Sequence, residues 1–313
     1  MTRRGWILFV AMSGIWGVPY LLIKVAVGAV EPATLVFLRT AVGAGLLLPL
    51  ALRPTEVRAL ARHWRPVLVY TGVEIGLPWL LLSDAERTLS SSLAALLVAA
   101  APFFGVVLHA LAGAHERLGP RRLGGLVLGL GGVALVVGLD TRGASVGAVG
   151  ELALAALCYA VGPMVIARHL TGLRPLTVVS ASLSLCALAY APYALTHLPV
   201  SLPAPNALAA IAGLAVVCTA VAFIVFFALI GEAGPVRATV ITYVNPAVAV
   251  TLGVLVLREP FTVSIGIGFA MILLGSVLAT ARAPAAAGAA LARRSAGAAP
   301  ARYSPLRQPE RDG

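Results

Sequence analysis

Apolar residues run along this chain in long stretches, broken by short joints that carry charges, prolines or glycines. A helix that crosses a bilayer needs roughly 17 to 25 mostly apolar residues, and stretches of that length recur from Trp6 to Ala281. The pattern predicts ten membrane-spanning helices, at residues 6–27, 33–52, 67–83, 92–112, 123–139, 147–167, 176–198, 207–230, 237–257 and 262–281. The expected fold class is therefore an all-α integral membrane protein.

Composition agrees with this class, since 60% of the residues are hydrophobic, 11% are charged and the mean hydropathy is +0.97. The formal net charge of +11 follows the loops. With the N-terminus in the cytoplasm, eighteen arginines fall on the inner side and only Arg87, Arg142 and Arg258 fall outside. Without the arginines of the C-terminal tail, the count is still twelve against three, which is the positive-inside pattern with both termini cytoplasmic. The basic charge is explained by topology, so no nucleic-acid partner is expected.

Arginine is used almost to the exclusion of lysine, and Lys24 is the single exception. Alanine and glycine are abundant. This usage suggests a GC-rich genome, and hence a multi-pass protein of the bacterial inner (plasma) membrane.

The chain repeats itself when it is shifted by 143 residues. The shift aligns Trp16 with Tyr159, Pro32 with Pro175, Thr34 with Thr177, Glu116 with Glu259, Gly125 with Gly268 and Gly132 with Gly275. Five spans per half is an odd number, so the second half enters the membrane upside down relative to the first. We expect two inverted five-helix repeats, residues 1–141 and 142–281, and a disordered cytoplasmic tail at 282–313, whose Ala, Pro, Gly and Arg residues bury too little surface to fold.

Several motifs resemble those of one known family. They are GIWGVPYLLIK (14–24), EPATLVFLR (31–39), the segment from AAAPFFG to LGGVAL (99–135), and the segment from YVNPAVAV to MILLG (243–275). Over residues 6–281 the chain resembles the EamA-type transporters of the drug/metabolite transporter superfamily. The resemblance implies a ten-helix bundle of two inverted repeats, and many members export metabolites or toxic compounds.

Glu74 interrupts the apolar run YTGVEIGLPWL at 70–80. It lies about 10 Å into the third span, where a lipid-facing carboxylate costs roughly 2.5 kcal/mol or more, so we expect it to face the bundle interior. Helical spacing places Gly72 and Gly76 on one face for packing, and Tyr70, Glu74 and Pro78 on another. Glu74 is predicted to carry protons as access alternates between the two sides, with the alternative that it is a hydrogen-bonded group that fixes helix packing.

Arg39 and Lys24 are further charges inside predicted spans, both in the outer third. Arg39 is expected to bind an anionic group of the solute or, alternatively, to form a structural ion pair. Lys24 either extends to the interface, which is favoured, or contacts the solute. The repeat offset pairs these residues and Glu74 with Ala167, Ser182 and Val217, so the second half carries none of the three charges.

Prolines and polar aromatic residues complete the predicted site. Pro102 and Pro246 fall near the middle of corresponding spans and are expected to kink them around a cavity, with ordinary structural kinks as the alternative. Residues expected to line the cavity are Trp16, Tyr159, Tyr243 and Asn245, whereas Tyr20, Trp79 and the serines at 90–92 also fit the membrane interface.

No enzyme active site, metal site or cofactor site is predicted. The run GLGGVA at 129–134 lies in an apolar helix and follows no strand, and no histidine pairs with a deep Ser, Cys or acid. Cys158, Cys186 and Cys218 are interpreted as small buried hydrophobes. The favoured function is a secondary transporter that exports a small metabolite or drug-like solute against protons, acting as a monomer or homodimer in the bilayer. The alternative is a membrane scaffold or sensor that transports nothing.

Overall fold

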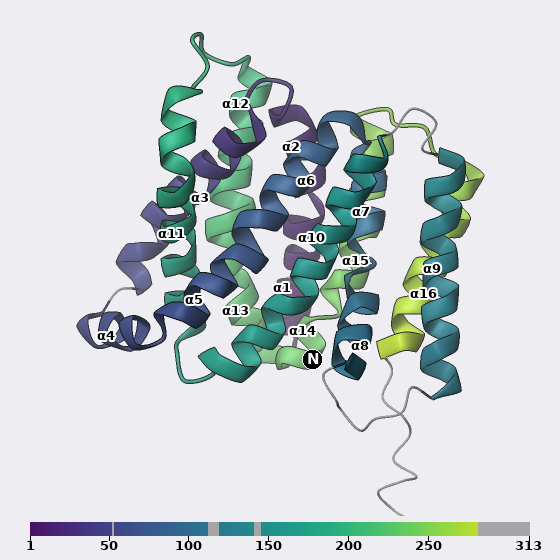
Figure 1. The fold of residues 1–313 in the computed structure, drawn as a ribbon, viewed down its shortest axis with the longest axis horizontal. Coiled ribbons are helices and arrows are strands. Elements are labelled where there is room, and N and C mark those ends of the chain that lie inside the picture. The colour runs from purple at the N-terminus through teal and green to yellow at the C-terminus, as the bar shows by residue number, and fades with distance from the viewer. Residues whose placement is uncertain (52, 112–118, 141–144, 281–313) are drawn as a thin grey trace, which may run out of the picture. The chain divides into compact units, whose positions relative to one another are not determined.

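The computed structural model describes residues 1–51, 53–111, 119–140 and 145–280, and these residues form helices without strands (Figure 1). The predicted tail at 282–313 and Glu116 lie outside the described residues. The first half contains α1 (Arg3–Gly17), α2 (Pro19–Ala26), α3 (Pro32–Ala51), α4 (Pro54–Arg62), α5 (Trp64–Tyr70), η1 (Thr71–Gly76), α6 (Leu77–Thr88), α7 (Ser91–Val98), α8 (Ala101–Leu111) and α9 (Pro120–Asp140). The second half contains α10 (Val146–Val165), η2 (Ile166–Leu170), α11 (Pro175–Thr196), α12 (Pro205–Ala212), η3 (Gly213–Val221), α13 (Ala222–Ala233), α14 (Pro235–Ala238), α15 (Ile241–Val256) and α16 (Val263–Thr280).

Nine helical segments of the described residues are long and apolar enough to cross a membrane. The apolar helix α15, Ile241–Val256, is shorter and corresponds to the ninth predicted span. The third predicted span, 67–83, was drawn too short, because the helical segment there runs from Trp64 to Thr88. Several spans consist of two or three elements in succession, since Pro19 and Pro78 each begin a new helix within a span.

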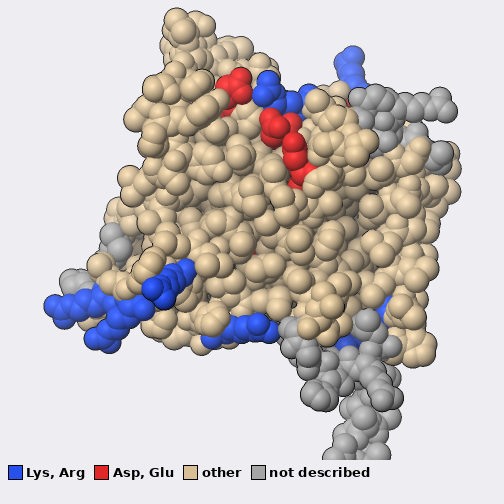
Figure 2. All heavy atoms as spheres, viewed as in Figure 1, with Lys and Arg blue, Asp and Glu red and all other residues tan. Residues whose placement is uncertain are grey.

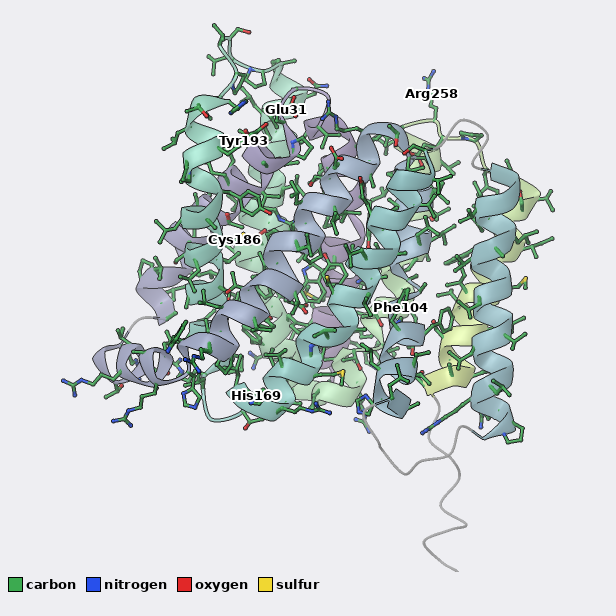
Figure 3. All side chains as sticks on the ribbon, viewed as in Figure 1. Glu31, Phe104, His169, Cys186, Tyr193 and Arg258 are labelled. Carbon is green, nitrogen blue, oxygen red and sulfur yellow. The ribbon has the colours of Figure 1, made fainter. Side chains whose placement is uncertain are left out.

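The first helix of each half runs in the opposite direction to its counterpart. Figure 3 shows Glu31 and Arg258 at one end of the bundle and His169 at the other, and we name these the Glu31 end and the His169 end. The α1–α2 pass finishes at Ala26, just before Glu31, whereas the α10–η2 pass finishes at Leu170, beside His169. The two halves are thus entered from opposite ends of the bundle.

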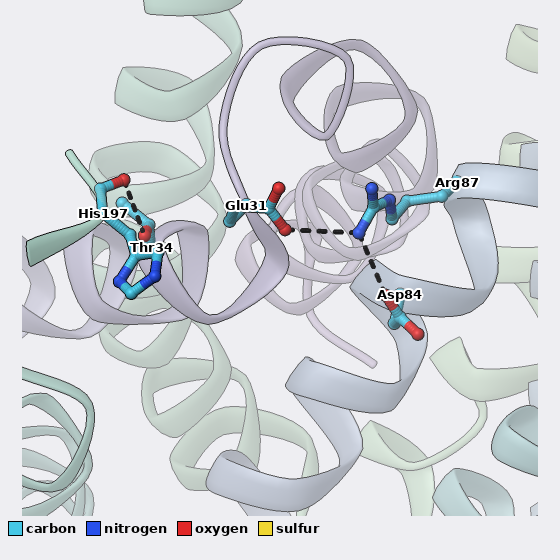
Figure 4. A network of polar contacts seen from close by, with 5 residues as sticks. All are labelled: Glu31, Thr34, Asp84, Arg87 and His197. Carbon is cyan, nitrogen blue, oxygen red and sulfur yellow. Dashed lines mark hydrogen bonds and ion pairs between the residues drawn. The ribbon is translucent and has the colours of Figure 1, made fainter. Parts of the chain in front are cut away.

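Helices α3 and α11 pack side by side and are tied by a reciprocal pair of hydrogen bonds. Thr34 Oγ1 on α3 donates to the His197 carbonyl after α11 over 3.5 Å (Figure 4), and Thr177 Oγ1 on α11 donates to the Ala51 carbonyl of α3 over 3.3 Å. Thr34 and Thr177 are equivalent positions at the repeat offset of 143. Each half therefore holds the other by the same contact, as a pseudo-two-fold arrangement requires.

Glycines let α9 and α16 pack in close backbone contact. A Cβ on Gly125 would lie 2.5 Å from the Ala279 amide nitrogen, and one on Gly132 would lie 2.8 Å from the Gly268 carbonyl. From the other side, a Cβ on Gly275 would lie 2.5 Å from the amide nitrogen of Gly129. The glycines that recur in the two halves thus form an interface within the chain, where small residues substitute for a hydrophobic driving force.

Charges separate between the two ends of the bundle. Figure 2 shows basic side chains gathered at the end where α4 lies, which is the His169 end, and acidic side chains near the Glu31 end. At the Glu31 end, Arg87 Nη1 lies 3.2 Å from Glu31 Oε2 and 3.6 Å from Asp84 Oδ1 (Figure 4). These ion pairs are about half exposed, so they stabilise the fold little.

Candidate functional site

Glu74 lies in a π-helical segment, η1, inserted between two α-helices. The Leu77 amide donates to the Gly72 carbonyl, five residues back. Pro78 follows at the start of α6 and has no amide to continue the α-helical ladder. A π-helical turn is uncommon and is frequent at functional sites.

The carboxyl of Glu74 points at the backbone of α10. A Cβ on Gly162 would lie 1.8 Å from Glu74 Oε2, so only glycine leaves room for this side chain. Oε2 is buried and has no hydrogen-bond partner among the described residues. The Tyr190 hydroxyl donates to the Gly76 carbonyl over 3.2 Å, and Gly76 also faces Cys186, which Figure 3 places midway between the two ends. Glu74 is thus a carboxyl without a donor near the middle of the bundle.

The expected glycine packing face beside Glu74 is wrong at one of its two positions. Nothing lies within 4 Å of a Cβ built on Gly72, which is exposed. Gly76 alone contacts α11. The prediction assumed the α-helical rotation per residue, which a π-helical turn does not keep.

The same irregularity occurs at the equivalent place in the second half. η1 spans Thr71–Gly76, and the repeat offset maps it onto residues 214–219, inside η3 (Gly213–Val221). Thr219 Oγ1 donates to the Leu214 carbonyl, again five residues back, over 2.8 Å. Two π-helical segments therefore interrupt corresponding helices, although only the first carries an acid.

Arg39 of α3 is buried between η3 and α6. Its Nε donates to Thr219 Oγ1 over 2.8 Å, Nη2 donates to the Cys218 carbonyl over 3.4 Å, and Cζ lies 3.6 Å from the centroid of the Trp79 ring. Arg39 has no carboxylate within ion-pair distance among the described residues. The ion-pair alternative is therefore wrong for this part of the chain, and the cation is held by a hydroxyl, a carbonyl and an aromatic face.

Tyr159 of α10 lies about one helical turn from Gly162, which contacts Glu74, and packs against the same apolar cluster as Trp79. Tyr20 of α2 interacts with Tyr159 and Arg39. Trp79 is buried beneath Arg39 instead of lying at the membrane interface. The structure thus brings together Glu74, Tyr159, Arg39, Tyr20 and Trp79, and we call this set the central cluster.

The remaining predicted site residues have other partners, although Trp16 packs against the same apolar cluster as Trp79 and Tyr159. The Trp16 ring packs on Phe226 at 4.7 Å and on Phe223 at 6.1 Å between centroids. The Tyr243 hydroxyl pairs with Thr280 Oγ1 at 2.8 Å, at the end of α16, and so does not line the central cluster. Tyr70 is buried among Val67, Leu170, Leu173 and Val178, with the Glu74 charge nearby. Asn245 Oδ1 is buried and has no partner among the described residues.

Lys24 does not extend freely to the interface as expected. Its ammonium donates to the carbonyls of Glu86 at 2.6 Å and Leu89 at 2.8 Å, at the end of α6. A cation at this position satisfies carbonyls that have no helical partner and complements the helix dipole. Lys24 is a helix cap in this structure.

The two deep prolines are not equivalent. The helix breaks at Ala99 and Ala100, just before Pro102, where α7 gives way to α8. Pro246 lies inside the continuous helix α15. The corresponding break in the second half comes earlier, at Thr239 and Val240, so the two prolines lie at different distances from the breaks.

A cavity of about 520 Å³ lies between α8, α9, α10 and α16. Its polar lining groups are His109, Arg122 and Thr280, and its apolar lining includes Pro102 and Pro163. Ala160, which follows Tyr159 of the central cluster, also lines it. α10 therefore separates this cavity from the cluster, with one face toward each.

Comparison with protein families decides the identity. The EamA-like transporter family model matches residues 3–138 and again residues 148–281. The chain belongs to the EamA-like transporter family. The two matches give this EamA-like chain a two-repeat architecture and, with its many apolar helices, make it a multi-pass membrane protein that transports small solutes.

A solved structure titled "Crystal structure of protein" is similar to the EamA-like chain, with a TM-score of 0.63 and 21% sequence identity. The likeness covers 90% of this chain and 98% of that chain. At this identity it concerns the fold alone. A search of the curated proteins finds no match.

Sequence reasoning missed Glu86 of the EamA-like chain. Glu86 is fully buried, and both of its carboxyl oxygens have no hydrogen-bond partner among the described residues. The predicted span stopped at residue 83, which placed Glu86 in a loop. A helical signal was present: Trp79, Leu82, Ser83 and Glu86 follow the spacing of one helix face, and all four are buried.

The serines at 90–92, for which both the cavity and the membrane interface were considered, serve the fold of this EamA-like chain. Glu259 Oε1 accepts from the amide and hydroxyl of Ser91 over 2.7 and 2.9 Å, and Glu259 Oε2 accepts from the amide of Ser92 over 3.0 Å and from its hydroxyl over 2.5 Å. The carboxylate of the second half thus caps the N-terminus of α7 in the first. Ser90 Oγ accepts from the Leu93 amide within the same cap. Cys158, Cys186 and Cys218 are free and buried, as predicted.

Proposed function

We propose that this EamA-like protein is a secondary transporter that exports a small metabolite or drug-like solute in exchange for protons. Ten spans, with α15 as the short ninth span, form two inverted repeats at 1–141 and 142–281. The His169 end faces the cytoplasm of a bacterium and the Glu31 end faces the exterior, because basic residues gather at the former.

One observation carries the proposal. Glu74 has a buried carboxyl oxygen without a donor, near the middle of a bundle that spans a membrane. Such a carboxyl is costly in lipid unless it is protonated or binds a ligand, and intramembrane acids mark proton and substrate pathways. The π-helical segment and Gly162 provide the space that the side chain occupies.

Arg39 supplies the complementary chemistry for the solute. It is a buried cation without a carboxylate partner in the described part of the chain, and it is stacked on Trp79. A guanidinium in this setting favours a solute with an anionic group beside an apolar or aromatic body. Tyr20 and Tyr159 add hydrogen-bonding hydroxyls around the same position.

We propose that solute and protons gain access alternately from the two ends, and the arrangement of the halves supports this. Polar contacts tie the Glu31 end together through Glu259, Lys24 and Arg87. The cavity of about 520 Å³ is lined by residues near the ends of α8 and α16, including His109 and Thr280. We interpret this conformation as closed at the Glu31 end.

The test uses purified protein in liposomes that contain a trapped fluorescent pH indicator. A panel of organic acids, amino acids and amphipathic drugs is presented to the vesicles in turn. A transported solute is expected to produce proton flux that depends on the solute and is absent from protein-free vesicles. The absence of any such flux across the panel would contradict the proposal and favour a membrane protein that does not exchange protons.

A further inference from the structure

Glu86 is a buried acid that the proposed transport site does not use. Its side chain is fully buried, and neither carboxyl oxygen has a hydrogen-bond donor among the described residues. It lies near the end of α6 at the Glu31 end, one residue before Arg87, which contacts Glu31. A carboxyl in this environment is stable only when it is neutral or paired with a cation.

A cation lies beside Glu86 but is bound to other groups. The Lys24 ammonium donates to the backbone carbonyls of Glu86 and Leu89, while it stays more than 4.0 Å from the carboxylate oxygens of every described acid. The Glu86 carboxyl nevertheless interacts electrostatically with Lys24. Lys24 can therefore serve either the carbonyls or the carboxylate, and in this structure it serves the carbonyls.

Two further titratable groups lie near Glu86. These are Glu259, which follows α15, and Tyr20 on α2. Glu259 is fixed by its four hydrogen bonds to Ser91 and Ser92. The remaining titratable groups on the elements that pack against α6 are Arg39 on α3, Glu74 on η1, and Glu151, Cys158 and Tyr159 on α10. Helix α7 carries none.

Tyr20 also lies near Arg39 and Tyr159, so Glu86 adjoins the central cluster.

We propose that Glu86 is a second proton-binding group of this transporter and that Lys24 and Glu86 together form a proton-operated latch at the Glu31 end. With Glu86 protonated, Lys24 caps the end of α6 and holds the short connection from α6 to α7. When Glu86 releases its proton to water at the Glu31 end, the carboxylate draws the Lys24 ammonium away from the two carbonyls. The connection is then free to separate from α2, and this end opens.

The inference rests on the proposed proton exchange and adds a direction to it. While the Glu31 end is open, a proton reaches Glu74 in the central cluster. A second proton then neutralises Glu86, stays on it and closes that end. Closing on proton binding is the order of events that exchange of an outgoing solute for an incoming proton requires.

The experiment measures exposure of the latch directly. Ala94 on α7 is fully buried, so Ala94→Cys in a background without the three native cysteines reports opening of the Glu31 end to a membrane-impermeant maleimide. Ala160→Cys, which lines the cavity toward the His169 end, is the matched reporter. Full-length protein in liposomes is labelled in acidic and in alkaline buffer. Labelling at each pH is divided by that of the same variant unfolded in detergent at that pH, because a thiol reacts as the thiolate and its rate rises with pH.

Labelling of the Ala94→Cys reporter is expected to rise roughly tenfold from acidic to alkaline buffer, because the hydrogen bonds from the Lys24 ammonium to the end of α6 are lost. Glu86→Gln cannot ionise, so its labelling is expected to stay at the acidic level at both pH values. A Glu86→Gln protein whose labelling still rises with pH would overturn the latch. Glu74→Gln is expected to keep the pH response of the reporter, because Glu74 is not part of the latch.

A second measurement covers the case in which Glu86→Gln does not fold. Infrared difference spectra of the reconstituted wild type between the two buffers are expected to contain the band of a protonated carboxyl, and Glu86→Asp is expected to move that band. A band that is unaffected by Glu86→Asp would overturn the assignment. If Glu74→Gln loses solute-dependent proton flux but labelling of the Ala94→Cys reporter does not depend on pH, only the latch is contradicted. If Glu74→Gln keeps that flux while reporter labelling depends on pH, only the proposed proton exchange at Glu74 is contradicted.

Discussion

Arg39 shows, at the scale of single residues, how this bundle holds a buried cation without a carboxylate. The guanidinium of Arg39 has three partners. Its Nε donates to Thr219 Oγ1, its Nη2 donates to the Cys218 carbonyl, and its flat face stacks on Trp79. A planar fork can make these contacts at once, whereas a single ammonium cannot. The guanidinium shape, and not only its charge, is used.

Arg39→Lys is therefore expected to be disruptive although it keeps the charge. Loss of the Thr219 hydrogen bond and of the stacking on Trp79 should lower stability by about 1–3 kcal/mol. Thermal unfolding of the purified protein in detergent measures this change. Arg58→Lys, on the exposed face of α4, is the matched control and should leave the unfolding temperature unchanged. Equal stability of Arg39→Lys and wild type would contradict the described geometry.

Gly162 provides the second test at this scale. Gly162→Ala places a Cβ 1.8 Å from Glu74 Oε2 and 2.9 Å from its Cδ, so the carboxyl must leave its position. We expect solute-dependent proton flux to fall by at least roughly tenfold, as for other displacements of a functional group. Gly72→Ala is the control in the same region, because nothing lies within 4 Å of its Cβ. Normal flux in Gly162→Ala would show that the contact is not needed.

The residue scale was partly readable from the sequence. The free-energy cost of exposing a charged side chain to lipid indicated that Glu74 and Arg39 face the interior of the bundle, and both do. Their partners could not be predicted, because Thr219 and Gly162 lie in the other half of the chain and approach only when the halves pack. The role of Lys24 was missed for a different reason: the carbonyls that it caps lie beyond residue 83, where the predicted third span ends.

At the scale of elements, the two halves share their irregularities more than their charges. η1 and η3 occupy equivalent positions, although their sequences, TGVEIG and GLAVVCTAV, have little in common. Hydrophobic periodicity locates a span but does not separate a π-helical turn from an α-helical one, because both are apolar and continuous. The span positions were therefore predictable, and the breaks inside them were not.

The interface of α9 and α16 gives the prediction for this scale. Gly132→Ala would bring a Cβ to 2.8 Å from the Gly268 carbonyl, so the helices must separate, at a cost of about 1–3 kcal/mol. Gly124→Ala, on the same helix with open space around its Cβ, should be neutral or stabilise by up to roughly 1 kcal/mol. Unfolding of both variants in the same detergent measures the difference. Similar stability of the two would show that α9 and α16 do not pack through this face.

At the scale of the whole molecule, the account depends on two halves that are entered from opposite ends. The reciprocal hydrogen bonds of Thr34 and Thr177 are consistent with this inverted arrangement of the two halves. The repeat was visible in the sequence because glycines, prolines and threonines at the helix contacts recur at one offset. The central cluster was not visible as a unit, because it draws on α2, α3, η1, α6 and α10 together.

Sidedness can be measured with introduced cysteines, since the native cysteines are buried. Val200→Cys, in the exposed loop after α11, is expected to react with an impermeant maleimide added outside intact bacteria. Arg58→Cys, on exposed α4 at the His169 end, is expected to react only after the membrane is opened. Labelling of Arg58→Cys in intact cells, with protection of Val200→Cys, would reverse the proposed orientation.

The central claim is that Glu74 carries the exchanged proton, and its pH dependence tests that claim most directly. For a solute that drives proton flux in the wild type, exchange of labelled solute across liposomes needs no net proton movement, whereas uptake driven by a pH gradient does. Glu74→Gln, which removes the titrating group and keeps the size, is expected to retain exchange and to lose gradient-driven uptake and its dependence on pH. Gradient-driven uptake in Glu74→Gln with the pH dependence of the wild type would contradict the account and leave Glu74 as a packing residue.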